Sequence, residues 1–400
     1  YVPSLYGQES WFDRAHNAFV DWLMAGGLPA FLLFISLFVA GIFSLWKYSE
    51  ISRPEKIALT AALVGYAVHN VFVFDNLYSY VYFFAILAFI DSQIARPTRM
   101  QEYASVSEEA VAINVLPVIG IVLFTVIWFI NVRNIGTAHA LVRAISPASY
   151  GFDTSAGLMK DLVSNASPYK QEIAEQSVNL FVQSLQAKEA IMETKQKLAT
   201  LAVTAMTEQV TRYPDDARER LELAYAYQNA GALDKALEQI AAAIALSPNK
   251  PDFYLQLGVL EWGRGNMQAA RTAFRKGYEV SNRATNLADY AAAGEIAVGD
   301  LAAARTILQM AYGTTTVDSN VLAFAYQNAK RWPELIALAK FRVAQAPADP
   351  QQYFALAGAY YQAGDRAGAV TVLRHVQALF PAAKDTAAQA ISQIQAGPGQ

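Results

Sequence analysis

The amino-acid sequence changes character partway along, from apolar blocks to an amphipathic repeat. Four stretches in the first part contain no charged residue: 22–46, 57–74, 76–90 and 110–132. A helix that crosses a bilayer needs about 20 mainly apolar residues. The third stretch reaches that length when it continues through residues 91–95 at the membrane surface. This pattern predicts four transmembrane helices.

Basic residues in the short loops predict how these helices are oriented. Lys47, Arg53 and Lys56 lie between the first two stretches, and Arg96 and Arg99 lie between the last two. The turn between the second and third stretches has neither lysine nor arginine. Because short basic loops stay in the cytoplasm, the residues before the first helix and after the fourth are expected outside it.

The second part of the chain repeats every 34 residues from Ala217 onward. Residues of the first helix recur as pairs: Leu223-Ala224, Leu257-Gly258, Ala291-Ala292, Leu322-Ala323 and Leu356-Ala357. The turn between helices has Gly231, Gly265, Gly299, Lys330 and Gly364, and the second helix has Ala236, Ala270, Ala304, Leu335 and Ala369. These residues resemble the tetratricopeptide repeat (TPR) family. The resemblance implies five helix-turn-helix repeats over residues 217–383, the third about three residues short.

The flanking segments complete an all-α fold of transmembrane helices followed by a solenoid. Residues 133–216 have a helical pattern without a clear repeat, and we interpret them as a helical stalk or as degenerate repeats. Residues 384–400 are interpreted as a capping helix and tail. The expected order is an external loop and helix (1–27), membrane helices (28–95), a cytoplasmic loop (96–109), the last membrane helix (110–132), the stalk and the solenoid.

Composition excludes several classes of protein. Charged residues make up 16% and hydrophobic residues 54% of the chain, which excludes a wholly soluble globule and a disordered chain. Without cysteine, no disulfide, thiolate metal site or cysteine nucleophile is possible. A net charge of −3 with no basic block argues against nucleic-acid binding. We expect no cofactor and no metal. Because the chain opens at Tyr1 in a polar, aromatic loop, we also expect it to be the C-terminal part of a longer protein.

The segment before the first apolar stretch carries the candidate chemistry. A helix that starts near Asp13 would hold Arg14 and His16 at the external membrane surface, with Asn17 and Asp21 as hydrogen-bonding partners on one face. A neutral imidazole can accept a proton from a hydroxyl near pH 7, and a guanidinium can bind a phosphate through two hydrogen bonds. An anchor at the membrane interface is the alternative for this pair.

The wider sequence resembles the C-terminal region of the O-antigen ligase (Wzy-C) superfamily of membrane glycosyltransferases. Arg14-Ala15-His16-Asn17, an apolar helix and then Gly26-Gly27 carry the resemblance, and residues 68–76 (VHNVFVFDN) are similar to the next part of the family's pattern. It covers residues 1–94. In place of a second glycine that many members have after the loop helix, this chain has Pro29-Ala30.

This resemblance implies transfer of a glycan from an undecaprenyl-diphosphate carrier to an acceptor hydroxyl outside the bacterial cytoplasmic membrane. His16 would activate the acceptor, Arg14 would steady the diphosphate and Asn17 would orient His16. The family's other loop arginines and upstream membrane helices are not in this sequence, so the chain alone is expected to be inactive. Within the second apolar stretch, His69 is interpreted as a helix-packing hydrogen-bond donor, and Asp75 as a solvated turn residue.

The concave face of the solenoid is the second candidate site. Positions that face the groove in TPR proteins correspond here to Tyr225, Gln228, Asn229, Trp262, Phe324, Gln327, Asn328, Tyr361 and Gln362. Aromatic and amide side chains can hold an extended peptide or stack on sugars, or can simply pack within the solenoid. The functions left open are an O-antigen ligase, a polysaccharide polymerase, a protein O-oligosaccharyltransferase, and a non-catalytic membrane-anchored TPR scaffold.

Overall fold

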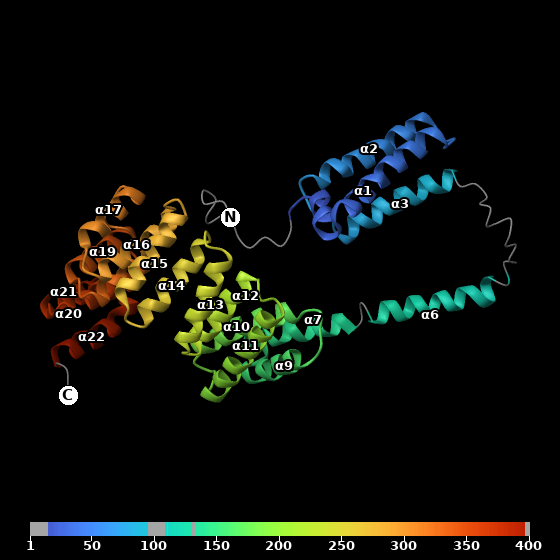
Figure 1. Ribbon diagram of the computed structural model, residues 1–400. Coiled ribbons are helices and arrows are strands. Elements are labelled where there is room, and N and C mark those ends of the chain that lie inside the picture. The colour runs from blue at the N-terminus through green and yellow to red at the C-terminus, as the bar shows by residue number, and fades with distance from the viewer. Residues whose placement is uncertain (1–14, 95–108, 110, 130–132, 397–400) are drawn as a thin grey trace. The chain divides into compact units, whose positions relative to one another are not determined.

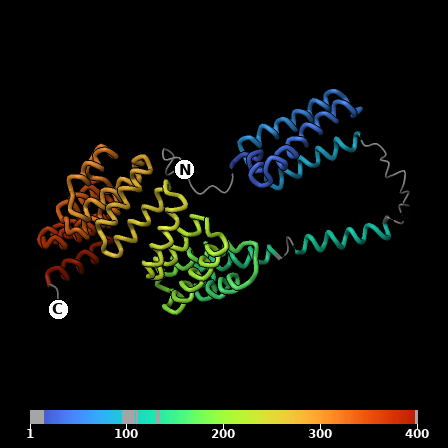
Figure 2. The backbone as a smooth tube through the Cα atoms, in the orientation of Figure 1, coloured from blue at the N-terminus to red at the C-terminus, as the bar shows by residue number. Residues whose placement is uncertain are grey.

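The computed structural model describes residues 15–94, 109, 111–129 and 133–396, and all of the regular secondary structure in these ranges is helical. The chain divides into two compact units, one formed by residues 9–125 and the other mainly by residues 126–400. Figure 1 labels the helices, and Figure 2 traces the backbone through them. Each unit is described on its own below.

The N-terminal unit includes three helices that pack together: α1 (Ala18–Lys47), α2 (Arg53–Asn70) and α3 (Leu77–Ile94). Gly27, with φ 65°, interrupts α1, so a short helix precedes a longer apolar one. Gly41 allows α1 and α3 to pack closely, because a Cβ there would lie 2.8 Å from Leu87. The buried core consists of Phe34, Phe38, Leu45, Leu63, Phe83 and Ile90.

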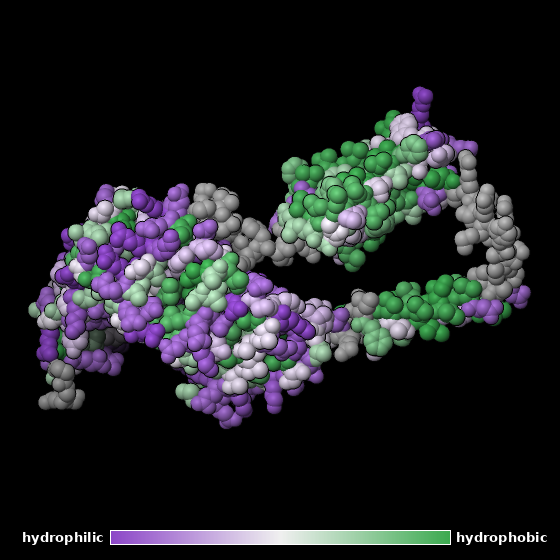
Figure 3. All heavy atoms as spheres, in the orientation of Figure 1, coloured by the Kyte–Doolittle hydropathy of each residue, from purple (hydrophilic) through white to green (hydrophobic). Residues whose placement is uncertain are grey.

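The outer surface of this unit is apolar. Leu33 is 68% exposed on α1 and Tyr82 is 71% exposed on α3, and Figure 3 shows hydrophobic residues covering the visible face of α1–α3. Among the described residues, α1 and α3 are the helices long and apolar enough to cross a membrane, and only 22% and 11% of their apolar windows are buried. Most residues of these two windows are therefore exposed in this unit and do not belong to its buried core.

The prediction of four transmembrane helices is supported for only two of the four stretches. Helix α2 begins with Arg53, Glu55 and Lys56, so its uncharged part is too short to span the membrane. The fourth stretch forms a π-helical turn (Val111–Val115) followed by α6 (Leu116–Ile127), and this apolar helix is also shorter than a span. The prediction failed because an uncharged stretch can run on past the end of its helix: α2 ends at Asn70, and the stretch continues to residue 74.

The C-terminal unit begins with helices that share a core with the first repeat. They are α7 (Arg133–Ala144), α8 (Pro147–Tyr150), α9 (Phe152–Ser164), α10 (Lys170–Gln186) and α11 (Met192–Arg212). Their buried side chains, which include Leu141, Met159, Phe181 and Met206, form one cluster with Leu223 of the first repeat. Residues 133–216 are thus packed helical layers that continue into the solenoid, not an isolated stalk.

Five helix pairs follow, as the 34-residue period predicts. They are α12/α13 (Ala217–Asn229, Leu233–Leu246), α14/α15 (Pro251–Gly263, Met267–Val280), α16/α17 (Thr285–Ala297, Leu301–Tyr312), α18/α19 (Asn320–Asn328, Trp332–Gln345) and α20/α21 (Pro350–Gln362, Arg366–Leu379). Helix α22 (Lys384–Ala396) covers the last pair (Figure 1). Between the third and fourth pairs, a loop at residues 313–319 separates α17 from α18, which starts at Asn320.

The turn residues adopt the left-handed backbone that glycine favours. Gly231, Gly265, Gly299 and Gly364 have φ between 79° and 88°. Lys330 holds the same place in the fourth pair, with φ 54°. A side chain in this region costs about 1 kcal/mol, so the turn geometry is set by the helix pair and not by glycine alone.

Small residues allow the two helices of each pair to approach. Ala236, Ala270, Ala304 and Ala369 are all 1% exposed or less. The closest approach is at Gly258 of α14, where a Cβ would lie 2.3 Å from the Phe274 ring of α15. A glycine inside a helix costs about 1 kcal/mol relative to alanine, and here the cost is offset because the aromatic ring packs directly on the helix backbone.

Replacing Gly258 with alanine should therefore destabilise the solenoid. We expect Gly258→Ala to lower the free energy of unfolding of the C-terminal unit by roughly 1–3 kcal/mol, because the Phe274 ring must move. Urea unfolding of the full chain in detergent, followed by circular dichroism, measures this. Gly358→Ala is the matched control: it lies inside α20 with open space around its Cβ position, so an alanine should stabilise the helix slightly. Equal effects of the two substitutions would contradict the packing explanation.

Candidate binding groove and membrane-proximal cleft

Three of the predicted groove residues, Gln228, Trp262 and Phe324, lie together in one pocket of about 450 Å³. We call it the Trp262 pocket; its other lining residues are Val259, Gly263, Phe274, Tyr290, Ala293, Asn320 and Val321. The Trp262 ring lies 5.9 Å from Phe324 and 6.2 Å from Phe274. The pocket is therefore walled mainly by aromatic and aliphatic side chains.

The pocket joins repeats that are not neighbours in the sequence. Trp262 belongs to the second pair and Phe324 to the fourth. Helix α16, the first helix of the third pair, contributes Tyr290 and the small Ala293 to the pocket wall. Its Gly294 packs closely on α15, since a Cβ there would lie 2.9 Å from the Arg271 backbone. Small side chains in the third pair thus leave the space in which the two aromatic rings approach.

The other predicted groove residues have different surroundings. Tyr225 packs into two adjoining hydrophobic clusters, and Asn229 donates to its carbonyl oxygen at 2.8 Å, which closes the end of α12. The amide of Gln228 accepts a hydrogen bond from Gln256. Tyr361 lines a separate pocket against α22, and three exposed amides lie on α18 and α20: Gln327, Asn328 and Gln362.

Two residues of the Trp262 pocket, Phe274 and Tyr290, were not predicted from the sequence. Phe274 lies on the second helix of its pair, and its ring fills the space above Gly258. Tyr290, whose ring centroid lies 5.7 Å from that of Phe274, precedes the repeated pair Ala291-Ala292. The available signal was the glycine at position 258, which indicates that a large side chain packs against it.

Carboxylates surround the N-terminal side of the groove. Burial, with smaller contributions from the neighbouring charges of Glu222 and Asp252, raises the pKa of Tyr225 to about 12. Asp289, next to the pocket residue Tyr290, accepts a hydrogen bond from the Tyr312 hydroxyl at 2.8 Å. Arg218 of α12 is paired with Glu175 at 2.6 Å. This side of the groove is therefore acidic.

Glu219 is a buried carboxylate at the start of the first repeat. It is 1% exposed, and neither of its carboxylate oxygens accepts a hydrogen bond within the described residues. Burial, with smaller contributions from Glu175 and Asp216, raises its pKa to about 7. Since the carboxyl is ionised above about pH 4.5 in the unfolded chain, the folded unit loses stability as the pH rises from about 4.5 to 7.

We expect Glu219→Met to remove this pH-dependent loss. The stability difference between the variant and the wild type, measured as the free energy of unfolding, should favour the variant by roughly 1–3 kcal/mol more at pH 8 than at pH 5. The reason is that methionine buries no charge at the higher pH. Urea unfolding at the two pH values measures the difference, and Glu208→Met, at an exposed position on α11, is the control. The same stability gain at both pH values would show that ionisation of Glu219 does not cause the effect.

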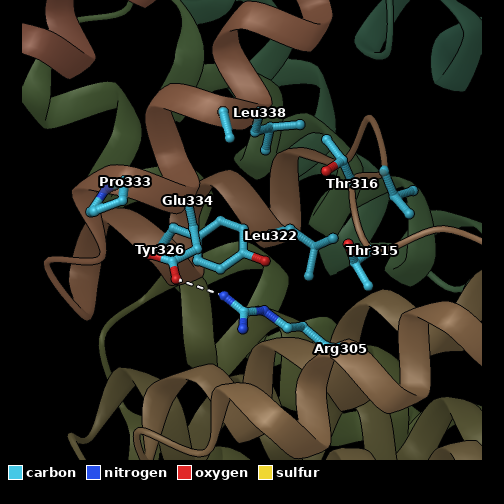
Figure 4. A pocket seen from close by; sticks show the side chains of 10 residues that line it. Arg305, Thr315, Thr316, Leu322, Tyr326, Pro333, Glu334 and Leu338 are labelled. Atoms are coloured by element: carbon cyan, nitrogen blue, oxygen red, sulfur yellow. Dashed lines mark hydrogen bonds and ion pairs between the residues drawn. The ribbon is translucent and has the colours of Figure 1, made fainter.

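A further pocket of about 240 Å³ lies between α17, α18 and α19. Figure 4 shows Arg305 directed toward Glu334, with which it forms an ion pair at 3.3 Å. Thr315 and Thr316 line the same pocket from the preceding loop. Because its charged groups already pair with each other, this pocket is a weaker candidate for ligand binding.

In the N-terminal unit, the predicted residues have other hydrogen-bonding partners than expected. Helix α1 begins at Ala18, capped by Asn17, whose Oδ1 accepts from the N–H groups of Phe19 and Val20. Asp21 accepts from the N–H of Ala15 at 3.1 Å. Asn17 and Asp21 therefore stabilise the entry to α1 through separate hydrogen bonds. Asp13 and Arg14 lie outside the described residues.

The segments around His16 and Asp75 lie side by side. The N–H of Ala18 donates to the Val73 carbonyl oxygen at 3.2 Å, and the His16 ring lies edge-on to Phe74 at 5.2 Å. Residues from both segments, including Ala15, Asp21 and Asp75, line a cleft of about 1240 Å³. We call this the Asp75 cleft.

Asp75 is buried, which corrects the expectation of a solvated turn residue. It is 9% exposed and accepts hydrogen bonds from Tyr66 and from Ser79, the latter at 3.2 Å. Asn70, fully buried, donates to its other oxygen at 3.4 Å. The packing role expected of His69 was also wrong, because its side chain is exposed. The described residues contain no cluster of ligands suited to a metal ion.

Comparisons with known proteins identify repeat proteins of the same type. No protein-family model matches the chain, and neither does any curated protein. Among solved structures, similarity is found to YrrB, described as a TPR protein with an unusual peptide-binding site (16% identity, 48% of this chain, all of that chain, TM-score 0.32). A TPR protein from Parabacteroides merdae (15%, 61% and 79%, TM-score 0.36) and yeast Tom70 (12%, 99% and 88%, TM-score 0.37) are also similar. The assignment of a TPR-like solenoid depends on this chain's own helix pairs.

Proposed function

We propose that this protein is a membrane-anchored scaffold whose TPR-like solenoid binds a polypeptide segment of a partner protein. The observation that carries the proposal is the Trp262 pocket, an apolar recess that the helix pairs leave open on the groove. Phe324 is 56% exposed there. Apolar recesses with a few polar groups at the edge are typical of binding sites.

The N-terminal unit supports anchoring in a membrane. Its core is small and aromatic, while the large apolar side chains of α1 and α3 are directed outward. Such a surface is costly in water and favourable in lipid. The polar residues at the ends of these helices, such as Asn17 and Lys47, suit the membrane surface.

Panning a random dodecapeptide display library against the full chain in nanodiscs tests the binding function. We expect enrichment of a defined set of peptides, which Phe324→Ala should release because it removes an exposed wall of the pocket. Empty nanodiscs are the control for binding to lipid. Failure to enrich any sequence above that control would contradict the scaffold proposal.

Glycan transfer is a second candidate function, favoured by the geometry of the Asp75 cleft. The His16 segment and residues 68–76, which carry the resemblance to O-antigen ligases, lie side by side at this cleft. The cleft shares Trp22 and Tyr80 with an apolar groove of about 640 Å³ along α1 and α3. A cleft that has Asp21, Asp75 and Asn76 in its lining and continues into an apolar groove suits a lipid-linked donor, and His16 would accept the proton of the attacking hydroxyl.

His16→Ala in the complete gene tests this second function. If His16 takes part in transfer, lipid-linked glycan should accumulate and the acceptor should remain unmodified, with membrane protein levels matched by immunoblot. His139→Ala, at an exposed position on α7, is the matched control. Unchanged surface glycan in the His16 variant would contradict glycan transfer and leave the scaffold as the only proposed function.

A further inference from the structure

The pocket of about 240 Å³ between α17, α18 and α19 combines a few polar groups with an aliphatic wall. We call it the Tyr326 pocket. Arg305, Tyr326 and Glu334 line it together (Figure 4), and Leu322 and Leu338 form part of the remaining wall. This combination is typical of sites for small molecules. The ion pair in the pocket disfavours most ligands, and it thereby narrows the class of ligand that fits.

An irregular connection of the solenoid builds one side of this pocket. Seven residues, 313–319, join the third helix pair to the fourth, whereas four residues join the other pairs: 247–250, 281–284 and 346–349. The longer loop contributes Thr315, Thr316 and Val317 to the pocket wall. The regular connections have no such loop, so this pocket is particular to the junction between the third and fourth pairs.

The Tyr326 hydroxyl is a polar group without a partner in the described part of the chain. Tyr326 is only 7% exposed, and no described residue forms a hydrogen bond with its hydroxyl. By contrast, the hydroxyls of three other solenoid tyrosines donate to oxygen atoms of the chain at 3.1 Å or less: Tyr254, Tyr312 and Tyr353. Because a buried hydroxyl without a partner is unfavourable, this one is suited to bind a ligand in the pocket.

The two charged groups of the pocket also retain binding capacity. One N–H of Arg305 donates to one oxygen of the partly buried Glu334 at 3.3 Å, and neither side chain forms another hydrogen bond with a described residue. A guanidinium has five N–H donors, and a carboxylate has two oxygens that accept. Burial and the Glu334 charge raise the pKa of Tyr326, and Arg305 lowers it. Both charges therefore act on the Tyr326 hydroxyl.

This ion pair selects a ligand that carries both charges. A ligand with a single charge would be attracted by one group and repelled by the other. A zwitterion adds to the pair without breaking it: its carboxylate accepts from the remaining N–H groups of Arg305, and its ammonium donates to the second oxygen of Glu334. The Tyr326 hydroxyl can donate to the same carboxylate. Each end of a peptide carries only one of these charges, so a free amino acid is the better match.

We infer that the Tyr326 pocket binds a free α-amino acid with a small aliphatic side chain. Val317, Leu322 and Leu338 supply apolar contacts for that side chain. A cavity of roughly 150 Å³ holds a benzene molecule, so this pocket has room for a molecule of the size of valine. The site is additional to the polypeptide site proposed above, and no residue lines both pockets.

Isothermal titration calorimetry on the full chain in detergent, with L-valine as the probe, tests this inference. We expect L-valine to bind with a dissociation constant below about 1 mM. Isovalerate is L-valine without its ammonium group, and isobutylamine is L-valine without its carboxylate. Each should bind at least about tenfold more weakly than L-valine, because one charge of the protein then has no counterpart. Absence of L-valine binding, or equal binding of either analogue, would overturn the inference.

Variants of the pocket show where L-valine binds. Tyr326→Phe keeps the ring, so it should preserve the circular dichroism spectrum while weakening binding about three- to tenfold. Arg305→Gln and Glu334→Gln should each weaken binding at least about tenfold. Arg264→Gln is the matched control, because it breaks a comparable ion pair outside the pocket, with Asp234 at 3.1 Å. Unchanged affinity in Tyr326→Phe and Arg305→Gln would place L-valine elsewhere and overturn the assignment.

Discussion

The close contact between the two helices of each repeat is the constraint on which the C-terminal unit depends. In four of the five pairs a buried alanine on the second helix allows the two helices to approach, and the fourth pair has Leu335 at that position. Gly258 under the Phe274 ring is the extreme case. The same contact shapes the groove: it brings Phe274 up to the concave side, beside Trp262. Packing and recognition therefore use the same residues.

The third repeat shows how a local departure from the period produces a site. Its first helix is rich in alanine and has Gly294 against the neighbouring backbone. The connection before α18 is seven residues long, 313–319, where the other pairs are joined by four, and Phe324 of α18 packs against Trp262. A regular solenoid with a large residue at Ala293 would fill this space.

Much of the fold follows from the sequence, since repetition shows each element five times over. The turn at Lys330 was placed correctly because its neighbours in the other copies are glycines. The apolar helices of the N-terminal unit were less predictable: a run of uncharged residues does not show where a helix ends, as α2 illustrates. Three-dimensional relations such as the burial of Asp75 by Tyr66 leave no periodic signal, because the partners come from different helices or turns.

The pairing of Trp262 with Phe324 has a thermodynamic consequence for the whole array. In a solenoid, each repeat is held mainly by its neighbours, so unfolding can begin at an end and progress one repeat at a time. A ligand held between the second and fourth pairs bridges three repeats at once and adds its binding free energy to that cooperative block. Partner occupancy would thereby set how far the array frays from its C-terminal end.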